Sequence, residues 1–397
     1  MTTDPKAGMI VTFFSWKGGV GRTTALANIA VQLARMGSRV LMVDWDLEAP
    51  GLDRFFLSAD ARQNANIIAQ PAHDQTGLMG LLNRALTTAD SPLTDTIWQD
   101  RLINLRVALP ESGMLGSVSA VPGRFDLLPS GQTPSDYSRR LSTFSWSSFL
   151  ADTGRGRWLE TLRDRWCAAY DYVLIDSRAG LSESAGICTV QMPHMLVLVF
   201  GTNEQSLDGG LHAVAAAQKE RRHFACDRAP LMVIPLLSRW EGENEVDIAE
   251  IWMQRLNRRL APLTAPWLPR AFPPRRFLEK TRVPHVPRFS FGEPLPVLTH
   301  SLTDPGLPGL YFDTVAKLIH SRLADVGSVI DPRYQDGEVV LGKTELLDMS
   351  AWIEGTREQF ANNEIGALIQ ESDFDRQYDF VDGTQGLQRE GAREFRR

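Results

Sequence analysis

The chain has 397 residues, of which 43% are hydrophobic, and a formal net charge of −6. This composition excludes global disorder and a general polyanion binder, and it allows one large α/β domain with insertions or two modest domains. Three widely spaced cysteines are not typical of a disulfide or metal framework, and no apolar stretch reaches the roughly 18 residues of a membrane span, so we expect a cytoplasmic protein.

A strand, a glycine-rich loop and a helix are predicted near the N-terminus. Residues 9–14 are apolar, and residues 23–36 carry apolar side chains at helical spacing before Gly37. Glycines let successive backbone N–H groups turn toward one phosphate chain, and the helix adds its positive end. We therefore predict a nucleotide-binding loop, with the Thr23 hydroxyl as a Mg²⁺ ligand. The alternative, a glycine-rich turn without a ligand, is disfavoured because strand, loop and helix agree. The predicted nucleotide contacts in this loop are Lys17, Gly18, Gly19, Val20, Gly21, Arg22, Thr23 and Thr24.

This loop departs from the ordinary P-loop pattern. Trp16 stands in the first glycine position, Arg22 stands in the lysine position, and Lys17 adds an earlier cation. The string Lys-Gly-Gly-Val-Gly-Arg-Thr-Thr resembles the deviant Walker A motif of ParA/MinD-like ATPases, in its KGGVGR variant branch. The resemblance implies that Lys17 reaches the partner's phosphates across a dimer. Arginine is planar and broader than a lysine ammonium, so Arg22 leaves the rate of hydrolysis open.

The next strand, residues 39–43, ends in two carboxylates. Asp44 and Asp46 would lie at the mouth of an open α/β sheet, where ligands bind, although acids of a helix cap or turn are the alternative. By resemblance to the family's second motif, Asp46 would position or deprotonate the attacking water and Asp44 would support the metal's water shell. Residues 48–51 would form a switch loop that senses the γ-phosphate.

Residues 53–165 carry weaker patterns. We expect a helix near residues 77–82, a strand followed by a turn at 125–131, and an aromatic stretch at 137–150. Clustered aromatic side chains favour core packing over a binding face. The resemblance covers roughly residues 9–56 and 165–325, which implies an insertion over about residues 57–160.

A later apolar strand ends at Asp176 in a Walker B pattern. Asp176 would hold Mg²⁺ through water, opposite Thr23. Gly180 would belong to a second switch. For Arg178 two interpretations stay open, a phosphate contact across a dimer and an ion pair that holds this switch.

Two further strands, residues 195–200 and 231–237, flank a helix. This alternation predicts an α/β fold of the P-loop NTPase type, with a mainly parallel central sheet and helices on both faces. The core would span 1–327, and 328–397 would be a partly helical extension with a mobile end. The strand ends lack a guanine-reading Asn-Lys-x-Asp motif, so adenine is favoured, and the resemblance places the base near Ser238, Arg239 and Pro287.

The resemblance implies a slow ATPase that uses ATP and Mg²⁺. It would be a homodimeric switch that hydrolyses ATP to ADP and phosphate to regulate or position an unidentified protein partner. The alternative is a nucleotide-binding scaffold with little or no hydrolysis, in a partitioning or a bacterial conflict or defence system. An electron-delivering ATPase is disfavoured because Cys188 has no second cysteine at suitable spacing, and a tyrosine kinase because Tyr378 stands alone in the last 60 residues. The sequence does not decide whether nucleic acid or a membrane surface is bound.

Overall fold

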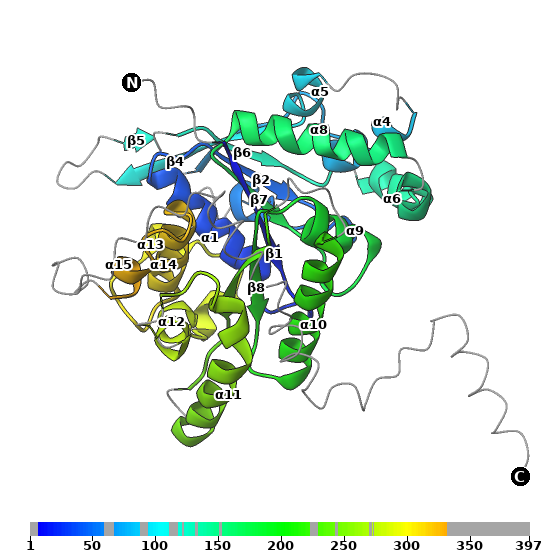
Figure 1. Ribbon diagram of the computed structural model, residues 1–397. Coiled ribbons are helices and arrows are strands. Elements are labelled where there is room, and N and C mark those ends of the chain that lie inside the picture. The colour runs from blue at the N-terminus through cyan, green and yellow to red at the C-terminus, as the bar shows by residue number, and fades with distance from the viewer. Residues whose placement is uncertain are drawn as a thin grey trace, which may run out of the picture. The chain divides into compact units, whose positions relative to one another are not determined.

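The computed structural model describes residues 7–58, 67–87, 94–110, 118–120, 123–131, 134–150, 153–222, 229–242, 245–269, 272 and 274–331. Within this part of the chain one nine-stranded sheet has the order β3-β4-β6-β2-β7-β1-β8-β9, with β5 paired to β4 (Figure 1). The strands are β1 (Met9–Phe14), β2 (Val40–Asp44), β3 (Ile67–Gln70), β4 (Ile103–Pro110), β5 (Val118–Ala120), β6 (Phe125–Leu128), β7 (Tyr172–Asp176), β8 (Met195–Phe200) and β9 (Met232–Leu237).

Six neighbouring strands, β6, β2, β7, β1, β8 and β9, all run parallel. Every residue of these six strands is buried, as expected for strands that are covered on both faces. The predicted mainly parallel sheet is thereby confirmed. The register places Asp176 beside both Phe13 and Asp44, so the ends of β1, β2 and β7 meet at one edge.

The remaining strands form an antiparallel extension of the sheet. β4 pairs antiparallel with β3, β5 and β6, and β6 connects this extension to β2. Leu105 and Val107 of β4 are buried whereas Asn104 and Arg106 are exposed, which is the alternation of a sheet covered on one face. The sequence pattern predicted β6 but neither β3 nor β4.

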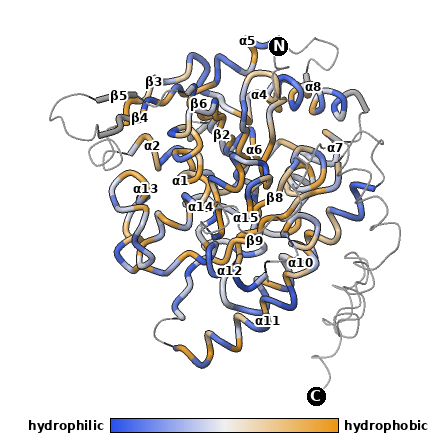
Figure 2. Tube along the Cα trace, turned by 60° about the vertical axis from the view of Figure 1, so that its left-hand side comes forward, coloured by the Kyte–Doolittle hydropathy of each residue, from blue (hydrophilic) through white to orange (hydrophobic). Residues whose placement is uncertain are grey.

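Helices cover both faces of the parallel half (Figure 1). On one side α1 (Arg22–Arg35) packs against α14 (Pro308–His320) and α13 (Pro296–Thr299), and α14 in turn contacts α12 (Pro274–Thr281) and α15 (Val326–Ile330). On the other side α8 (Thr153–Ala169) contacts β7, and α10 (Glu204–Arg221) contacts β8. β8 and β9 run as hydrophobic stretches through the molecule, and α8 on the outside is largely hydrophilic (Figure 2). The other helices are α2 (Arg54–Leu57), α4 (Gly77–Thr87), α5 (Asp95–Gln99), α6 (Pro134–Thr143), α7 (Trp146–Leu150), α9 (Glu183–Gly186), a π-helical turn (Ile187–Gln191), α11 (Val246–Thr264) and a 3₁₀ turn (Pro287–Ser290).

An aromatic core lies between the sheet and helices α4, α7 and α8. Trp45, Trp166 and Phe149 are fully buried in it, and the Trp45 and Trp166 rings meet edge to face with centroids 6.4 Å apart. Tyr137, Phe144 and Trp146 pack against it while staying partly exposed. The predicted packing role of the 137–150 aromatic stretch is thereby confirmed, as is the helix near 77–82, which is part of α4.

The C-terminal part of the chain is described only as far as Asp331. α15 continues past Gly327, near which we expected the core to close, and Asp331 pairs with Arg276 of α12. The rest of the predicted extension, through residue 397, lies outside the described residues. Among the helices that the structure describes, none is both long and apolar enough to cross a membrane.

Candidate functional site

The loop between β1 and α1 leaves a helix N-terminus open. Gly19 and Gly21 adopt φ of +73° and +86°, the left-handed region that favours glycine. A Cβ added at Gly18 or Gly19 would meet nothing within 4 Å. Gly21 caps α1 without a side-chain hydrogen bond, so the first N–H groups of the helix stay available for an anion. These features fit a phosphate-binding loop.

Lys17 and its neighbours define the start of this loop. The Ser15 hydroxyl donates to the Lys17 carbonyl oxygen over 2.9 Å, and the Gly180 N–H donates to the Ser15 carbonyl oxygen over 3.0 Å. The Lys17 side chain is half-buried and forms no ion pair within the described residues. It is thus a cation at the loop without a counter-charge among the residues that the structure describes.

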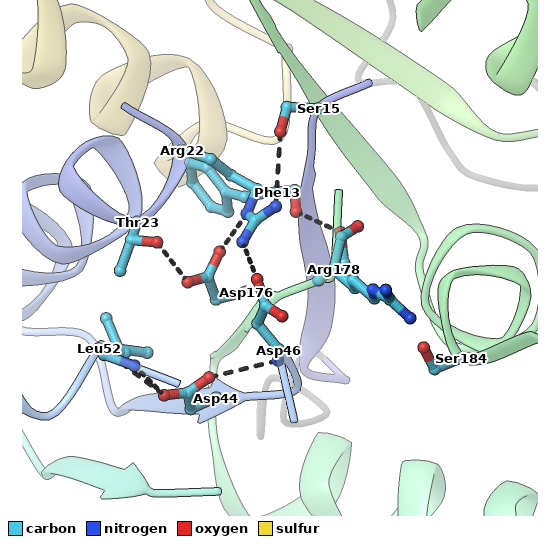
Figure 3. Close-up of polar contacts among 12 residues, drawn as sticks. Phe13, Ser15, Arg22, Thr23, Asp44, Asp46, Leu52, Asp176, Arg178 and Ser184 are labelled. Atoms are coloured by element: carbon cyan, nitrogen blue, oxygen red, sulfur yellow. Dashed lines mark hydrogen bonds and ion pairs between the residues drawn. The ribbon is translucent and has the colours of Figure 1, made fainter. Parts of the chain in front are cut away.

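Arg22 is directed toward carboxylates at the strand ends (Figure 3). Its Nε lies 2.5 Å from Asp176 Oδ1, its Nη2 lies 2.7 Å from Asp46 Oδ2, and its Nη1 lies 3.4 Å from Ser15 Oγ. Only 8% of the side chain is exposed. Burial lowers the pKa of Arg22, but the charges and hydrogen bonds of Asp176 and Asp46 outweigh burial and leave it raised. The guanidinium therefore stays charged and offsets the charge of one of the two carboxylates that it contacts.

Thr23 and Asp176 meet as the sequence predicted. The Thr23 hydroxyl donates to Asp176 Oδ2 over 2.7 Å, while Asp176 Oδ1 accepts from Arg22. A hydroxyl and a carboxylate side by side at the end of a phosphate loop suit Mg²⁺, which takes few protein ligands and keeps several waters. In the described part of the chain no group of three or more His, Cys, Asp or Glu residues forms a cage for a metal ion.

Asp44 faces the loop that follows it. Its Oδ2 accepts from the backbone N–H groups of Gly51 and Leu52 at 3.1 and 3.2 Å, and its Oδ1 accepts from that of Asp46 at 3.3 Å. Burial, and then the charge of Asp176, raise the pKa of Asp44 well above its usual value. The carboxylate of Asp44 thus holds residues 46–52, and its role in supporting the metal's water shell stays a prediction.

Asp46 keeps one carboxylate oxygen on Arg22. Burial raises the pKa of Asp46, and the Arg22 charge opposes that rise without cancelling it. The residue lies at the edge of the site, with 12% of its side chain exposed.

The two predicted switch loops are linked to each other. Arg178 forms an ion pair with Glu48, as the ion-pair interpretation expects. Ser177 binds β1, with its N–H and hydroxyl both donating to the Phe13 carbonyl oxygen. The loop after β7 is therefore attached to the phosphate loop on one side and to the loop after β2 on the other.

Tyr137 is a contact that the sequence analysis missed. Its hydroxyl, carried by α6, donates to the carbonyl oxygen of Leu47. Burial is the main reason that the pKa of Tyr137 rises to about 12, and the charges of Asp44 and Asp46 contribute. The available signal was an aromatic residue in a predicted packing segment, which does not reveal a hydrogen bond to a distant loop.

The predicted base-binding residues lie on two adjoining segments. Ser238 follows β9, and a Cβ added at Gly21 would lie 3.2 Å from its hydroxyl oxygen, so Ser238 borders the phosphate loop. Arg239 is exposed with a φ of +55°. Pro287 is exposed at the start of the 3₁₀ turn. The residues just before it pair with those that follow Arg239, since the His285 N–H donates to the Trp240 carbonyl oxygen over 2.8 Å.

This geometry agrees with comparisons to known proteins. The model of the CobQ/CobB/MinD/ParA nucleotide binding domain matches residues 11–272, so the chain belongs to this family. The chain is 48% identical over 48 residues to an uncharacterized ATP-binding protein of Methanocaldococcus jannaschii, covering 12% of this chain and 18% of that protein. It is 26% identical over 197 residues to the septum site-determining protein MinD of Synechocystis, covering 50% of this chain and 54% of that protein.

Solved structures of similar proteins cover more of the chain at lower identity. MinD of Pyrococcus horikoshii, complexed with Mg-ADP, gives a TM-score of 0.46 at 19% identity, over 81% of this chain and 98% of that one. The structure of pNOB8 ParA bound to nonspecific DNA gives a TM-score of 0.43 at 17% identity, over 83% and 100%. In sequence, the chain spans about half or less of the length of the two curated relatives described above.

Proposed function

We propose that the chain is a Mg²⁺- and ATP-dependent homodimeric switch that hydrolyses ATP slowly to ADP and phosphate and so regulates or positions a protein partner. The observation that carries the proposal is one juxtaposition. The uncapped N-terminus of α1 lies beside the Thr23–Asp176 pair and Asp46. In this proposal the switch core spans residues 1–327 with an insertion over about 57–160, and residues 328–397 extend it.

Each predicted site residue takes a role in this proposal. The N–H groups from Gly18 to Thr24 would hold the phosphates, and Thr23 and Asp176 would hold Mg²⁺, whose charge offsets that of the phosphates. Asp46 would orient or deprotonate the attacking water, and Asp44 would support the metal's water shell. Lys17 would reach the partner protomer's phosphates. The residues Ser238, Arg239 and Pro287 would border the adenine.

Arg22 keeps N–H donors that its carboxylate partners do not use. Its guanidinium is held by Asp46 and Asp176 at 2.7 and 2.5 Å through Nη2 and Nε. A β- or γ-phosphate would be contacted either by Nη1, which lies 3.4 Å from Ser15 Oγ, with both carboxylates in place, or by Nη2 after Asp46 is released. Release of Asp46 would leave that carboxylate free to accept a proton from water.

The test is dimerisation of the full chain with a non-hydrolysable ATP analogue and Mg²⁺, measured by sedimentation velocity. Wild-type protein should dimerise only with the analogue. Lys17→Ala should bind the analogue as a monomer within about threefold of wild type but dimerise at least about tenfold more weakly. Lys280→Ala, an exposed lysine on α12, is the matched control and should behave as wild type. Equal dimerisation of Lys17→Ala and wild type would remove the cross-dimer role.

The Arg22–Asp46 ion pair favours a second candidate, a nucleotide-held scaffold with little or no hydrolysis. A carboxylate neutralised by a buried guanidinium is a weak base. Steady-state ATPase measurements on wild type and Arg22→Lys separate the candidates. The switch predicts measurable turnover and a changed rate in Arg22→Lys, with faster turnover expected if the arginine fork holds the ground state tightly. Analogue binding without turnover in either protein would establish the scaffold.

A further inference from the structure

Trp16 occupies the position at which an ordinary P-loop has its first glycine, and its ring contacts a helix rather than solvent alone. The side chain is half-buried, and it lies against Gly209, a buried residue of α10. A Cβ added at Gly209 would lie 2.2 Å from Cδ2 of the indole and 2.3 Å from its Cε2 and Cγ. Real Cβ atoms do not approach so closely, so only glycine at position 209 accommodates the ring where it lies.

The neighbouring glycine of α10 has different surroundings. A Cβ added at Gly210 would meet the side chain of Leu198, with the nearest atom 3.0 Å away, and that flexible side chain can adjust. Each glycine in a helix interior costs about 1 kcal/mol relative to alanine, so both positions have the same intrinsic propensity cost. The ring of Trp16 therefore distinguishes Gly209 from Gly210.

The backbone around Trp16 is fixed on its other side. The carbonyl oxygen of Ser15 accepts from the Gly180 N–H over 3.0 Å, and the Ser15 hydroxyl donates to the Lys17 carbonyl oxygen over 2.9 Å. The carbonyl oxygen of Trp16 lies 3.6 Å from the Cβ position of Gly180. The residue is thus held by its ring against α10 and by its neighbours' backbone against the loop after β7, directly before Lys17.

We infer that Trp16 is a positioning residue: its ring, seated on Gly209, holds the phosphate-binding loop in place and fixes the direction in which Lys17 leaves it. A displaced ring would move the backbone that carries the N–H groups of Gly18 and Gly19. The inference rests on the proposed nucleotide-binding function of this loop.

The test is calorimetric titration of the purified full chain with Mg²⁺ and a non-hydrolysable ATP analogue. Gly209→Ala should bind about tenfold more weakly than wild type, because the added methyl displaces the ring. Gly210→Ala, with the same propensity change in the same helix, should bind within about twofold of wild type. In a Trp16→Ala background, Gly209→Ala should have no further effect, since the two positions then no longer interact.

Thermal unfolding without nucleotide separates positioning from stability. Both glycine variants should unfold at similar temperatures while only Gly209→Ala loses affinity. If Gly209→Ala does not fold, Trp16→Phe should keep affinity within about threefold and Trp16→Ala should lose about tenfold. Equal affinities of the folded variants and wild type, or equal losses in both glycine variants, would overturn the positioning role alone. Wild-type protein that does not bind the analogue would overturn the proposed function and this inference with it.

Discussion

Two loops at the same edge of the sheet are built in opposite ways. The loop after β1 is open: Gly18 and Gly19 face space, and Lys17 has no ion pair within the described chain. The loop after β2 is closed by contacts to the protein interior. Its Asp44 carboxylate accepts three backbone N–H groups, and its Trp45 is fully buried.

The difference separates the binding of a ligand from the transmission of its effect. An open loop can adapt to phosphates, whereas a closed loop moves only if its contacts move as well. Those contacts lead away from the site, because Trp45 packs on Trp166 of α8 and Leu47 accepts a hydrogen bond from Tyr137 of α6. The loop after β2 is therefore suited to relay changes at Asp46 to α6 and α8.

The largest effect is expected for Asp176, which ends β7 at the edge of the sheet where both loops lie. Asp176→Ala should weaken Mg²⁺-dependent binding of the ATP analogue by about a hundredfold, because Thr23 loses its carboxylate partner and Arg22 loses one of its two. Calorimetry with and without Mg²⁺ measures it. Asp164→Ala, which removes a carboxylate that is 74% exposed, is the control and should leave affinity unchanged. Full affinity in Asp176→Ala would mean that the carboxylate does not serve the open loop.

The closed loop should control turnover more than binding. Asp46→Ala should still bind ATP and dimerise, but it should hydrolyse ATP at least about tenfold more slowly, a loss of roughly 1.4 kcal/mol of transition-state stabilisation. Steady-state phosphate release and sedimentation measure the two properties separately. An unchanged rate would exclude Asp46 from catalysis, and lost binding would show that the two loops are not separable.

A smaller effect should follow when the hydrogen bond between α6 and the closed loop is removed. Tyr137→Phe removes one hydrogen bond to Leu47, a loss of about 1 kcal/mol. Amide hydrogen exchange should quicken in residues 45–52. Tyr311→Phe, which removes a hydroxyl bond to Pro305 far from this loop, is the matched control and should not change exchange there. If both variants leave residues 45–52 equally protected, the loop does not depend on the insertion.

The smallest effect is expected from the titration of the Asp44 carboxyl group in the closed loop, measured as thermal stability without nucleotide or metal. The pKa of Asp44 is raised in the folded state, mainly by burial, so the folded protein holds its proton more tightly than the unfolded chain does. Stability from this group is present below the unfolded pKa of about 4 and is lost as pH rises through the folded pKa. The melting temperature of Asp44→Asn minus that of wild type should therefore increase between pH 5 and pH 8, by a few degrees at most. A constant difference would contradict the shift.

The open loop and the strand ends beside it could be predicted from the sequence because each motif is local. The glycines, Thr23 and the strands ending in Asp44 and Asp176 follow short patterns whose geometry is fixed by a strand end or a helix start. Their meeting followed from the parallel order of the sheet. The direction of the Arg22 side chain could not be predicted. The motif places a positive charge at residue 22 but does not specify which of several nearby carboxylates will pair with it.

The closed loop and the strands β3 and β4 could be predicted from the sequence only in part. Strands β3 and β4 were missed since their identity depends on pairing with each other and with β6, not on their own pattern. The inward turn of Asp44 depends on N–H groups seven and eight residues later, which no short-range pattern reports. α12 buries Phe277 and Leu278 in a proline-rich stretch of the sequence, because packing overrode local propensity.

The pairing of β1 has a consequence for how the molecule is made. β1 lies between β7 and β8, and Arg22 is 154 positions before its partner Asp176. On the ribosome, the largely apolar Met9–Phe14 segment, which is fully buried in the folded protein, emerges long before either neighbouring strand has been synthesised. Contacts so distant in sequence form slowly, and strands exposed in the interval favour aggregation. Nascent chains that stop before β7 are therefore expected to depend on chaperones, whereas chains that extend past β8 can enclose the strand themselves.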